Sequence, residues 1–141
     1  MDEASLAEEL NRILATLDYE PSRILGPRVI SASRRTNPPR GQSIWVESDG
    51  TFGYVKTDDE RGRRDERISS DDPYDVLYAV AYRIAHKIAS AEAESIWDGS
   101  GDYRRILFNR LFPKMEALGA PYLSRYNNYI VRVLSRNPYR D

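Results

Sequence analysis

The chain has 141 residues, of which 40% are hydrophobic and 30% are charged, and this balance suits one domain and excludes a membrane-embedded protein. It contains no cysteine and one histidine, which excludes disulfide frameworks, thiolate zinc sites and metal motifs that need two histidines. The formal net charge is only −1, but residues 1–102 hold 13 basic and 20 acidic side chains, whereas residues 103–141 hold 8 and 2.

The first predicted element is an amphipathic helix over residues 4–17. Its apolar residues recur at helical spacing on one stripe, which is made of Leu6, Leu10, Ile13, Leu14 and Leu17. Residues 22–42 follow a less regular pattern. Within them, two apolar pairs, Ile24-Leu25 and Val29-Ile30, form either a short strand or an extended packing segment, and residues 33–41 have the composition of a loop.

Residues 43–57 give the clearest β signal, because two apolar stretches flank a turn at Asp49-Gly50. That pair readily adopts the positive φ angles of a tight turn, so the pattern predicts an antiparallel hairpin. A second turn over residues 58–62 leads to a charged third strand over residues 63–68, which would complete a meander.

Three helices are predicted in the rest of the chain. The first spans residues 71–91, and the third spans residues 121–136. The second spans residues 103–118 and contains Pro113, which is expected to kink or split it because proline removes an internal hydrogen bond. Helices that follow a separate meander indicate an α+β fold: an N-terminal helix, two to three antiparallel strands and three packed helices, forming one domain over the whole chain.

The chain begins without a basic segment that leads into an apolar one, so it does not start like a secretory signal. No apolar run approaches the roughly 18–20 residues that cross a bilayer. With no cysteine to oxidise, the expected compartment is the cytoplasm, and no membrane partner is expected.

The sequence carries no motif for catalysis, a cofactor or a metal. His86 lies inside a predicted helix without the spacing of a zinc motif, and any Ser-His-Asp triad would have to pass through it. Glycine-rich phosphate loops are absent, and the acidic pair Asp58-Asp59 lacks the spacing of a calcium loop. We therefore expect no enzymatic activity and no cofactor. A hydrolase centred on His86 is kept as an alternative hypothesis, beside the two that follow.

The basic C-terminal section supports an alternative function. Arginines interleaved with aromatic rings bind nucleic acids through phosphate contacts and base stacking, and this section holds Tyr103, Tyr122, Tyr126, Tyr129 and Tyr139. The whole chain lacks the basic bias typical of such proteins. We therefore favour arginines that neutralise the acidic first section within the fold, and keep a nucleic-acid-binding or regulatory domain as the alternative.

Two sequence blocks and a helix end resemble a known family. The blocks are Asp72-Pro73-Tyr74-Asp75-Val76-Leu77-Tyr78 and Asp102-Tyr103-Arg104-Arg105-Ile106-Leu107-Phe108, and the helix ends in Asn137-Pro138-Tyr139. Together with the meander they resemble the Immunity protein 63 family, found beside bacterial polymorphic toxins, best over residues 43–141. The resemblance implies a non-enzymatic immunity protein that binds a cognate toxin, blocks its active site or an essential surface, and protects the producing cell.

Arg104 and Arg105 open a predicted helix, where the helix dipole disfavours positive charge. Nearby carboxylates are therefore expected to hold them, and the candidates are Asp72, Asp75 and Asp102.

The candidate partner-binding site lies on the meander. Many toxins of such systems act on nucleic acids and are basic, so an acidic surface would speed encounter with a nuclease-type toxin and match its charge. The acidic candidates are Glu47, Asp49, Asp58, Asp59 and Glu60. Trp45 and Tyr54 are the candidate aromatic anchors beside them. The alternative interpretation is a solvated turn next to two core aromatics.

Overall fold

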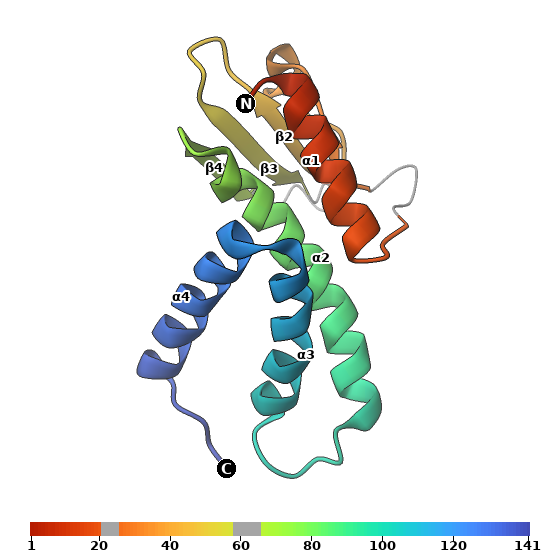
Figure 1. Cartoon of the computed structure of the whole chain (residues 1–141), viewed down its shortest axis with the longest axis vertical. Coiled ribbons are helices and arrows are strands. Elements are labelled where there is room, and N and C mark those ends of the chain that lie inside the picture. Colours follow the sequence, from red (N-terminus) through yellow and green to blue (C-terminus); the bar gives the residue numbers. More distant parts are fainter. Residues whose placement is uncertain (21–25, 58–65) are drawn as a thin grey trace. The chain divides into compact units, whose positions relative to one another are not determined.

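The computed structural model describes residues 1–20, 26–57 and 66–141 (Figure 1). The chain divides into two compact units, Met1–Val80 and Ala81–Asp141, and each is described by itself. In chain order the elements are α1 (Glu3–Thr16), β1 (Arg28–Val29), the 3₁₀ turn η1 (Ala32–Arg34), β2 (Gly41–Val46), β3 (Phe52–Thr57), β4 (Glu66–Ser70), α2 (Pro73–Ile96), α3 (Tyr103–Leu118) and α4 (Ala120–Arg136). The predicted α+β class and element order are confirmed, and the described residues form a sheet of four strands instead of two or three.

Helix α1 forms where the apolar spacing predicts it, within one residue at each end. The Asp2 carboxylate caps it by accepting a hydrogen bond from the Ser5 amide at 2.8 Å, and its negative charge suits the helix dipole. The predicted apolar stripe faces inward, with Leu6, Leu10 and Ile13 buried. Helix α1 packs against β1 and β2 (Figure 1).

The strands are ordered β1-β2-β3-β4 in the sheet. Strands β2 and β3 form the predicted hairpin, in which Ile44 pairs with Tyr54, and Gly50 takes a φ of +89° in the turn. Strand β4 runs antiparallel to β3 and ends two residues beyond the predicted third strand. The predicted residues 63–65 of that strand lie outside the described residues. The additional strand is β1, which pairs in parallel with β2 and resolves the two alternatives for Val29 in favour of a strand. Ile24 and Leu25 lie outside the described residues.

Both faces of the β2–β3 hairpin are buried. Side chains alternate between the faces of a strand, so Ile44 and Tyr54 point to one side. Trp45 and Val55 point to the other, and all four side chains are at most 5% exposed. On this second face Trp45 and Val55 form an apolar cluster with Ile30. The segment that precedes β2 therefore covers the face of the sheet that bears Trp45.

Each of the three later helices has a recognisable end. Helix α2 begins at Pro73, and the Asp72 carboxylate accepts a hydrogen bond from the Tyr74 amide at 2.9 Å. Helix α3 is one helix that contains Pro113, so the proline does not split it. Gly119, with a φ of +108°, ends α3 and lets α4 begin at the next residue. Among the described residues, no helix is both long and apolar enough to cross a membrane.

Candidate partner-binding site

Glu47 follows the last residue of β2, and its carboxylate is already used within the fold. Its Oε1 atom accepts a hydrogen bond from Trp45 Nε1 at 2.8 Å and lies 3.4 Å from Arg35 Nε. The Arg35 carbonyl in turn accepts a hydrogen bond from Arg67 Nη1 at 3.2 Å. Sequence reasoning missed Arg35, because twelve residues and an irregular loop separate it from Glu47. Since Arg35 compensates its charge, Glu47 attracts a distant partner less than an unpaired carboxylate would.

Asp49 lies in the turn between β2 and β3 and is exposed. Its Oδ1 atom accepts hydrogen bonds from the Thr51 amide at 2.9 Å and from the Thr51 hydroxyl at 2.7 Å. These hydrogen bonds, that of the amide first, hold the pKa of Asp49 below its ordinary value, so the carboxylate is ionised at neutral pH. Asp49 therefore presents a fixed negative charge at the tip of the hairpin.

Trp45 and Tyr54 are core residues. Their exposures are 5% and 1%, and the indole of Trp45 lies against Gly53 so closely that a Cβ atom there would stand 2.2 Å from the ring. The Tyr54 hydroxyl donates a hydrogen bond to Gln42 Oε1 at 3.0 Å. Neither ring is exposed to a partner, which corrects the expectation that both act as surface anchors and agrees with the alternative interpretation of core aromatics.

Asp58, Asp59 and Glu60 lie outside the described residues. Strand β3 ends at Thr57 and β4 begins at Glu66, so these three acidic residues belong to the connection between two antiparallel strands. Their role as an acidic turn that meets a partner stays a prediction.

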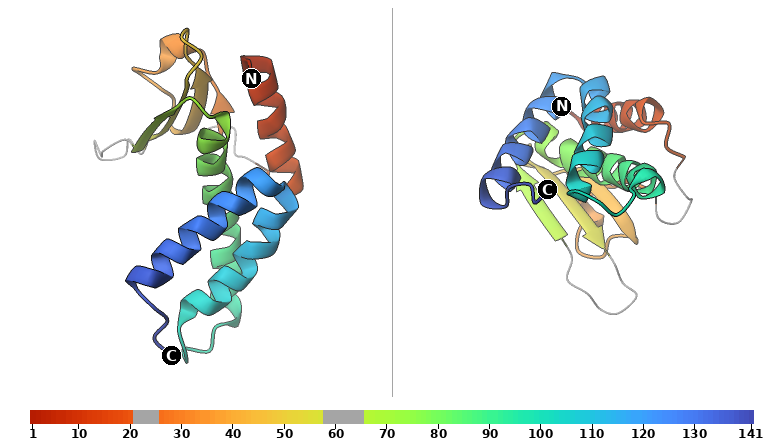
Figure 2. Two further views of the ribbon diagram at one scale, coloured as in Figure 1. Left: turned by 60° about the vertical axis from the view of Figure 1, so that its left-hand side comes forward. Right: turned by 90° about the horizontal axis from the view of Figure 1, so that it is seen from below.

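A second group of charged residues holds the end of the chain against the start of α3. We call this group the C-terminal staple, and it consists of Asp102, Arg104, Arg105 and Asp141. The Asp102 carboxylate accepts hydrogen bonds from the Arg104 guanidinium, the shortest at 2.7 Å, and from the Arg140 amide at 3.0 Å. The same guanidinium donates to the carbonyl oxygens of Asn137 at 2.7 Å and Pro138 at 2.9 Å. Asp102 and Arg104 therefore fasten the residues that follow α4 to the start of α3, as the path of the chain shows (Figure 2).

Arg105 completes the staple from the next position. It forms an ion pair with Asp141, and its guanidinium carbon lies 4.0 Å from the centre of the Tyr139 ring. The corresponding distance from Arg104 to this ring is 5.5 Å. The helix end Asn137-Pro138-Tyr139 and the pair Arg104-Arg105 are far apart in the sequence but form one contact in the fold.

The expected carboxylate partner of Arg104 is confirmed for Asp102 alone. Asp75 instead accepts a hydrogen bond from the Ser70 hydroxyl at 2.6 Å, at the start of α2. Asp72 caps the same helix through the Tyr74 amide. Asp141, the partner of Arg105, was not foreseen, because 36 residues separate the two and no spacing rule links them.

The tyrosines of the C-terminal section are engaged in packing. Tyr122 and Tyr126 are 0% and 2% exposed, and the Tyr126 hydroxyl donates to the Phe108 carbonyl at 3.3 Å. Tyr129 stands edge-on to Tyr82 with ring centres 5.2 Å apart. Together with Tyr139 beneath the staple arginines, these rings do not form the exposed stacking platform that single-stranded nucleic acid uses.

Several arginines of this section are neutralised locally. Arg104 and Arg105 pair within the staple. Glu92 on α2 binds Lys114 Nζ at 2.7 Å and Arg110 Nη1 at 3.6 Å. The positive charge of the section is therefore partly compensated inside the helical unit itself.

Trp97 and Tyr103 flank the connection between α2 and α3. The two rings stand edge-on with centres 5.5 Å apart, and Trp97 Nε1 donates to the Ser100 carbonyl at 3.0 Å. Trp97 is nevertheless 40% exposed, unlike Trp45.

His86 lies on α2, where its ring contacts Ser90 and Tyr82. Its Nδ1 atom is 3.4 Å from the Ser90 hydroxyl, and its ring centre is 5.6 Å from that of Tyr82. In the part of the chain that the structure describes, no carboxylate forms a hydrogen bond or ion pair with this ring. The oriented acid that a Ser-His-Asp triad requires is therefore not found beside His86.

Comparison with known proteins gives one result. A sequence model of the family described as Immunity protein 63 matches residues 49–131, more than half of the chain. The match covers β3 to α3 and most of α4, so it is narrower than residues 43–141 and stops before the residues that the staple holds. No curated protein and no solved structure matches the chain.

Proposed function

The chain belongs to the Immunity protein 63 family, and from this premise we propose that it binds and neutralises a cognate bacterial toxin domain in the cytoplasm of the producing cell. The family match carries the proposal. Within the described residues, no carboxylate forms a hydrogen bond or ion pair with His86, which weakens the hydrolase hypothesis. The burial of Tyr122 and Tyr126 weakens the nucleic-acid hypothesis. Protection would then come from binding and not from a reaction.

The proposed contact is formed by the acidic turns of the meander. Asp49 supplies a fixed charge in the turn before β3, and Asp58, Asp59 and Glu60, which follow the other end of β3 in the chain, would add three more. An acidic surface raises the rate of encounter with a basic nuclease-type toxin and helps to orient it. Glu47 contributes less to this attraction, because Arg35 lies beside its carboxylate.

Co-expression tests the function itself. Cells that produce the toxin domain encoded next to this chain are expected to grow when they also produce the chain, and to die when they produce an unrelated immunity protein. The variant His86→Ala is expected to protect as well as the wild type, because binding does not need the imidazole. Loss of protection in this variant with unchanged toxin binding would point to an enzyme.

Charge reversal tests the proposed contact. Replacing Asp58, Asp59 and Glu60 with lysine is expected to weaken toxin binding about tenfold or more, mainly through slower association and most strongly at low salt. The measurement is the association and dissociation rate of an inactive toxin domain on the immobilised chain.

The matched control for this variant changes the same total charge elsewhere, through lysine at the exposed residues Glu8, Glu20 and Glu94. If the control triple weakens binding as much as the turn triple, net charge and not the turn governs the affinity. Binding of RNA by the wild-type chain with a steep salt dependence would instead favour the nucleic-acid hypothesis.

A further inference from the structure

The outward side of α4 differs in character from the rest of the helix. Its inward side buries Tyr122 and Tyr126. Its exposed residues form a stripe along the whole helix, which we call the outer α4 surface: Ala120, Ser124, Asn127, Asn128, Val131, Arg132, Ser135 and Arg136. Helix α4 contains no acidic residue, so this surface combines neutral polar, apolar and positively charged side chains.

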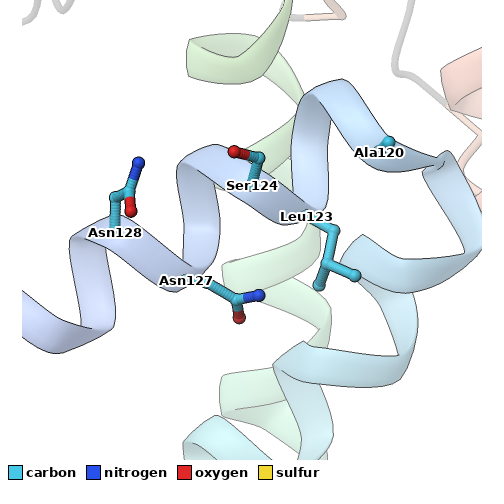
Figure 3. Close-up of a pocket in the computed structure, with 5 residues that line it drawn as sticks. All are labelled: Ala120, Leu123, Ser124, Asn127 and Asn128. Carbon is cyan, nitrogen blue, oxygen red and sulfur yellow. The ribbon is translucent and has the colours of Figure 1, made fainter.

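The first half of this surface is hollowed. A shallow, open depression of about 400 Å³ is lined by Ala120, Leu123, Ser124, Asn127 and Asn128. Leu123 and Asn127 project from one flank of the helix, one turn apart, and Ser124 and Asn128 project from the other (Figure 3). The depression therefore offers an aliphatic side chain together with amide and hydroxyl groups that both donate and accept hydrogen bonds.

The second half of the surface is apolar and positively charged. Val131, one turn beyond Asn127, is 68% exposed, the highest value among the exposed large hydrophobic residues of the described chain. Arg132 and Arg136 follow, and within the described residues neither guanidinium group takes part in an ion pair or a hydrogen bond. Arg104, Arg105 and Arg110 of the same section pair with carboxylates of the chain, whereas these two are available to a carboxylate from another molecule.

We propose that the outer α4 surface binds an acidic segment of the toxin, with an apolar side chain of that segment seated against Val131 and the hollow. The inference rests on the proposed function and adds a second contact of opposite charge to the acidic meander. Charge complementarity selects the occupant, because two unpaired arginines and no acidic residue favour carboxylates. A protein segment suits the surface better than nucleic acid does, since its exposed stripe holds no aromatic ring for base stacking.

Reversing the two free charges tests the proposal. The full-length variant Arg132→Glu/Arg136→Glu is expected to bind the inactive toxin domain at least about tenfold more weakly, because carboxylates would face carboxylates. A matched control, Arg34→Glu/Lys87→Glu, makes the same change in net charge at two other exposed cations and is expected to stay within about twofold of the wild type. Titration calorimetry at low and moderate salt gives the affinities.

Two additional variants keep the test sharp. Arg136 ends α4, where a positive charge interacts favourably with the helix dipole, so its reversal could lower the helix content. In that case the neutral variant Arg132→Gln/Arg136→Gln replaces the reversal in the binding measurement. Val131→Ser removes the apolar contact without changing charge and is also expected to weaken binding. Both should keep the circular dichroism spectrum and melting temperature of the wild type, because all three side chains are exposed.

The outcomes separate this inference from the proposed function. If the wild type binds and protects but the reversed and control variants bind equally well, the α4 contact is wrong while the immunity function stands. Failure of the wild type to bind or protect overturns both. If the wild type binds a 20-nucleotide RNA and only the reversal abolishes this, the surface takes nucleic acid and the acidic segment is excluded.

Discussion

Replacing Gly53 with alanine is expected to destabilise the chain by about 1–3 kcal/mol, which is the usual cost of forcing an extra carbon into a packed core. A Cβ atom at this position would lie 2.2 Å from the indole of Trp45. The ring has little room to move away, because it packs with Ile30 and Val55 and is tied to Glu47 by a hydrogen bond. Chemical denaturation followed by far-ultraviolet circular dichroism measures the effect.

The sign of the change in unfolding free energy distinguishes a steric conflict from an effect on the unfolded chain. Without a steric conflict, replacing glycine by alanine restricts the unfolded chain and stabilises a protein by about 0.4–1 kcal/mol. In a Trp45→Val background the ring is gone, so Gly53→Ala is expected to become neutral or stabilising. Equal destabilisation in both backgrounds would mean that the ring and the glycine are not coupled as the structure places them.

Replacing Asp102 with asparagine is expected to release the residues that the C-terminal staple holds. Asparagine caps a helix about as well as aspartate, so the start of α3 should survive while the charge that binds Arg104 is lost. The Arg140 amide, which donates to this carboxylate, is expected to lose most of its protection against hydrogen exchange. The core of α3, around Leu111, should keep its protection.

Arg105→Met provides the comparison for this variant. Its ion pair with Asp141 is more exposed than the Asp102–Arg104 pair, with 54% and 44% against 20% and 10% for the two side chains. Surface ion pairs contribute little, so this change should loosen the chain end less than Asp102→Asn does. The reverse ranking would place the main attachment at Arg105.

The staple also predicts how this attachment depends on pH. Hydrogen bonds from the Arg104 side chain, followed by those from the Arg140 and Arg104 amides, hold the pKa of Asp102 well below its ordinary value of 3.8. A carboxyl group with a lowered pKa in the folded state stabilises that state at pH values above 3.8, and this contribution is lost as the pH falls further. In the Asp102→Asn variant, the stability of the folded state should lack this part of its dependence on pH.

The order of elements was predictable from sequence because apolar periodicity reports which side of an element is buried. The burial of Trp45 and Tyr54 was not predictable, since their strands carry apolar residues on both faces and the period alone does not tell whether each face is covered. The cover for the Trp45 face comes from the segment around Ile30, which has too few residues in regular structure to show a pattern.

In the candidate site too, contacts between residues close in sequence were predictable and contacts between distant residues were not. The partnership of Arg104 with Asp102 was predictable, since both stand within one helical turn and the helix dipole calls for a carboxylate. The contacts of Arg35 with Glu47 and of Arg105 with Asp141 join residues far apart in the chain, and only the folded backbone brings them together. The outer α4 surface was not predictable, because the sequence does not distinguish its unpaired arginines from the paired ones.

The two tryptophans lie in different units and in different surroundings. Trp45 is closed in by Ile30 and Val55 within Met1–Val80, whereas Trp97 stands 40% exposed within Ala81–Asp141. Indole emission shifts to longer wavelength as the ring meets water, so each unit carries its own intrinsic optical reporter. Phenylalanine at one tryptophan at a time would let the unfolding of the sheet unit and of the helical unit be followed independently in the full-length chain.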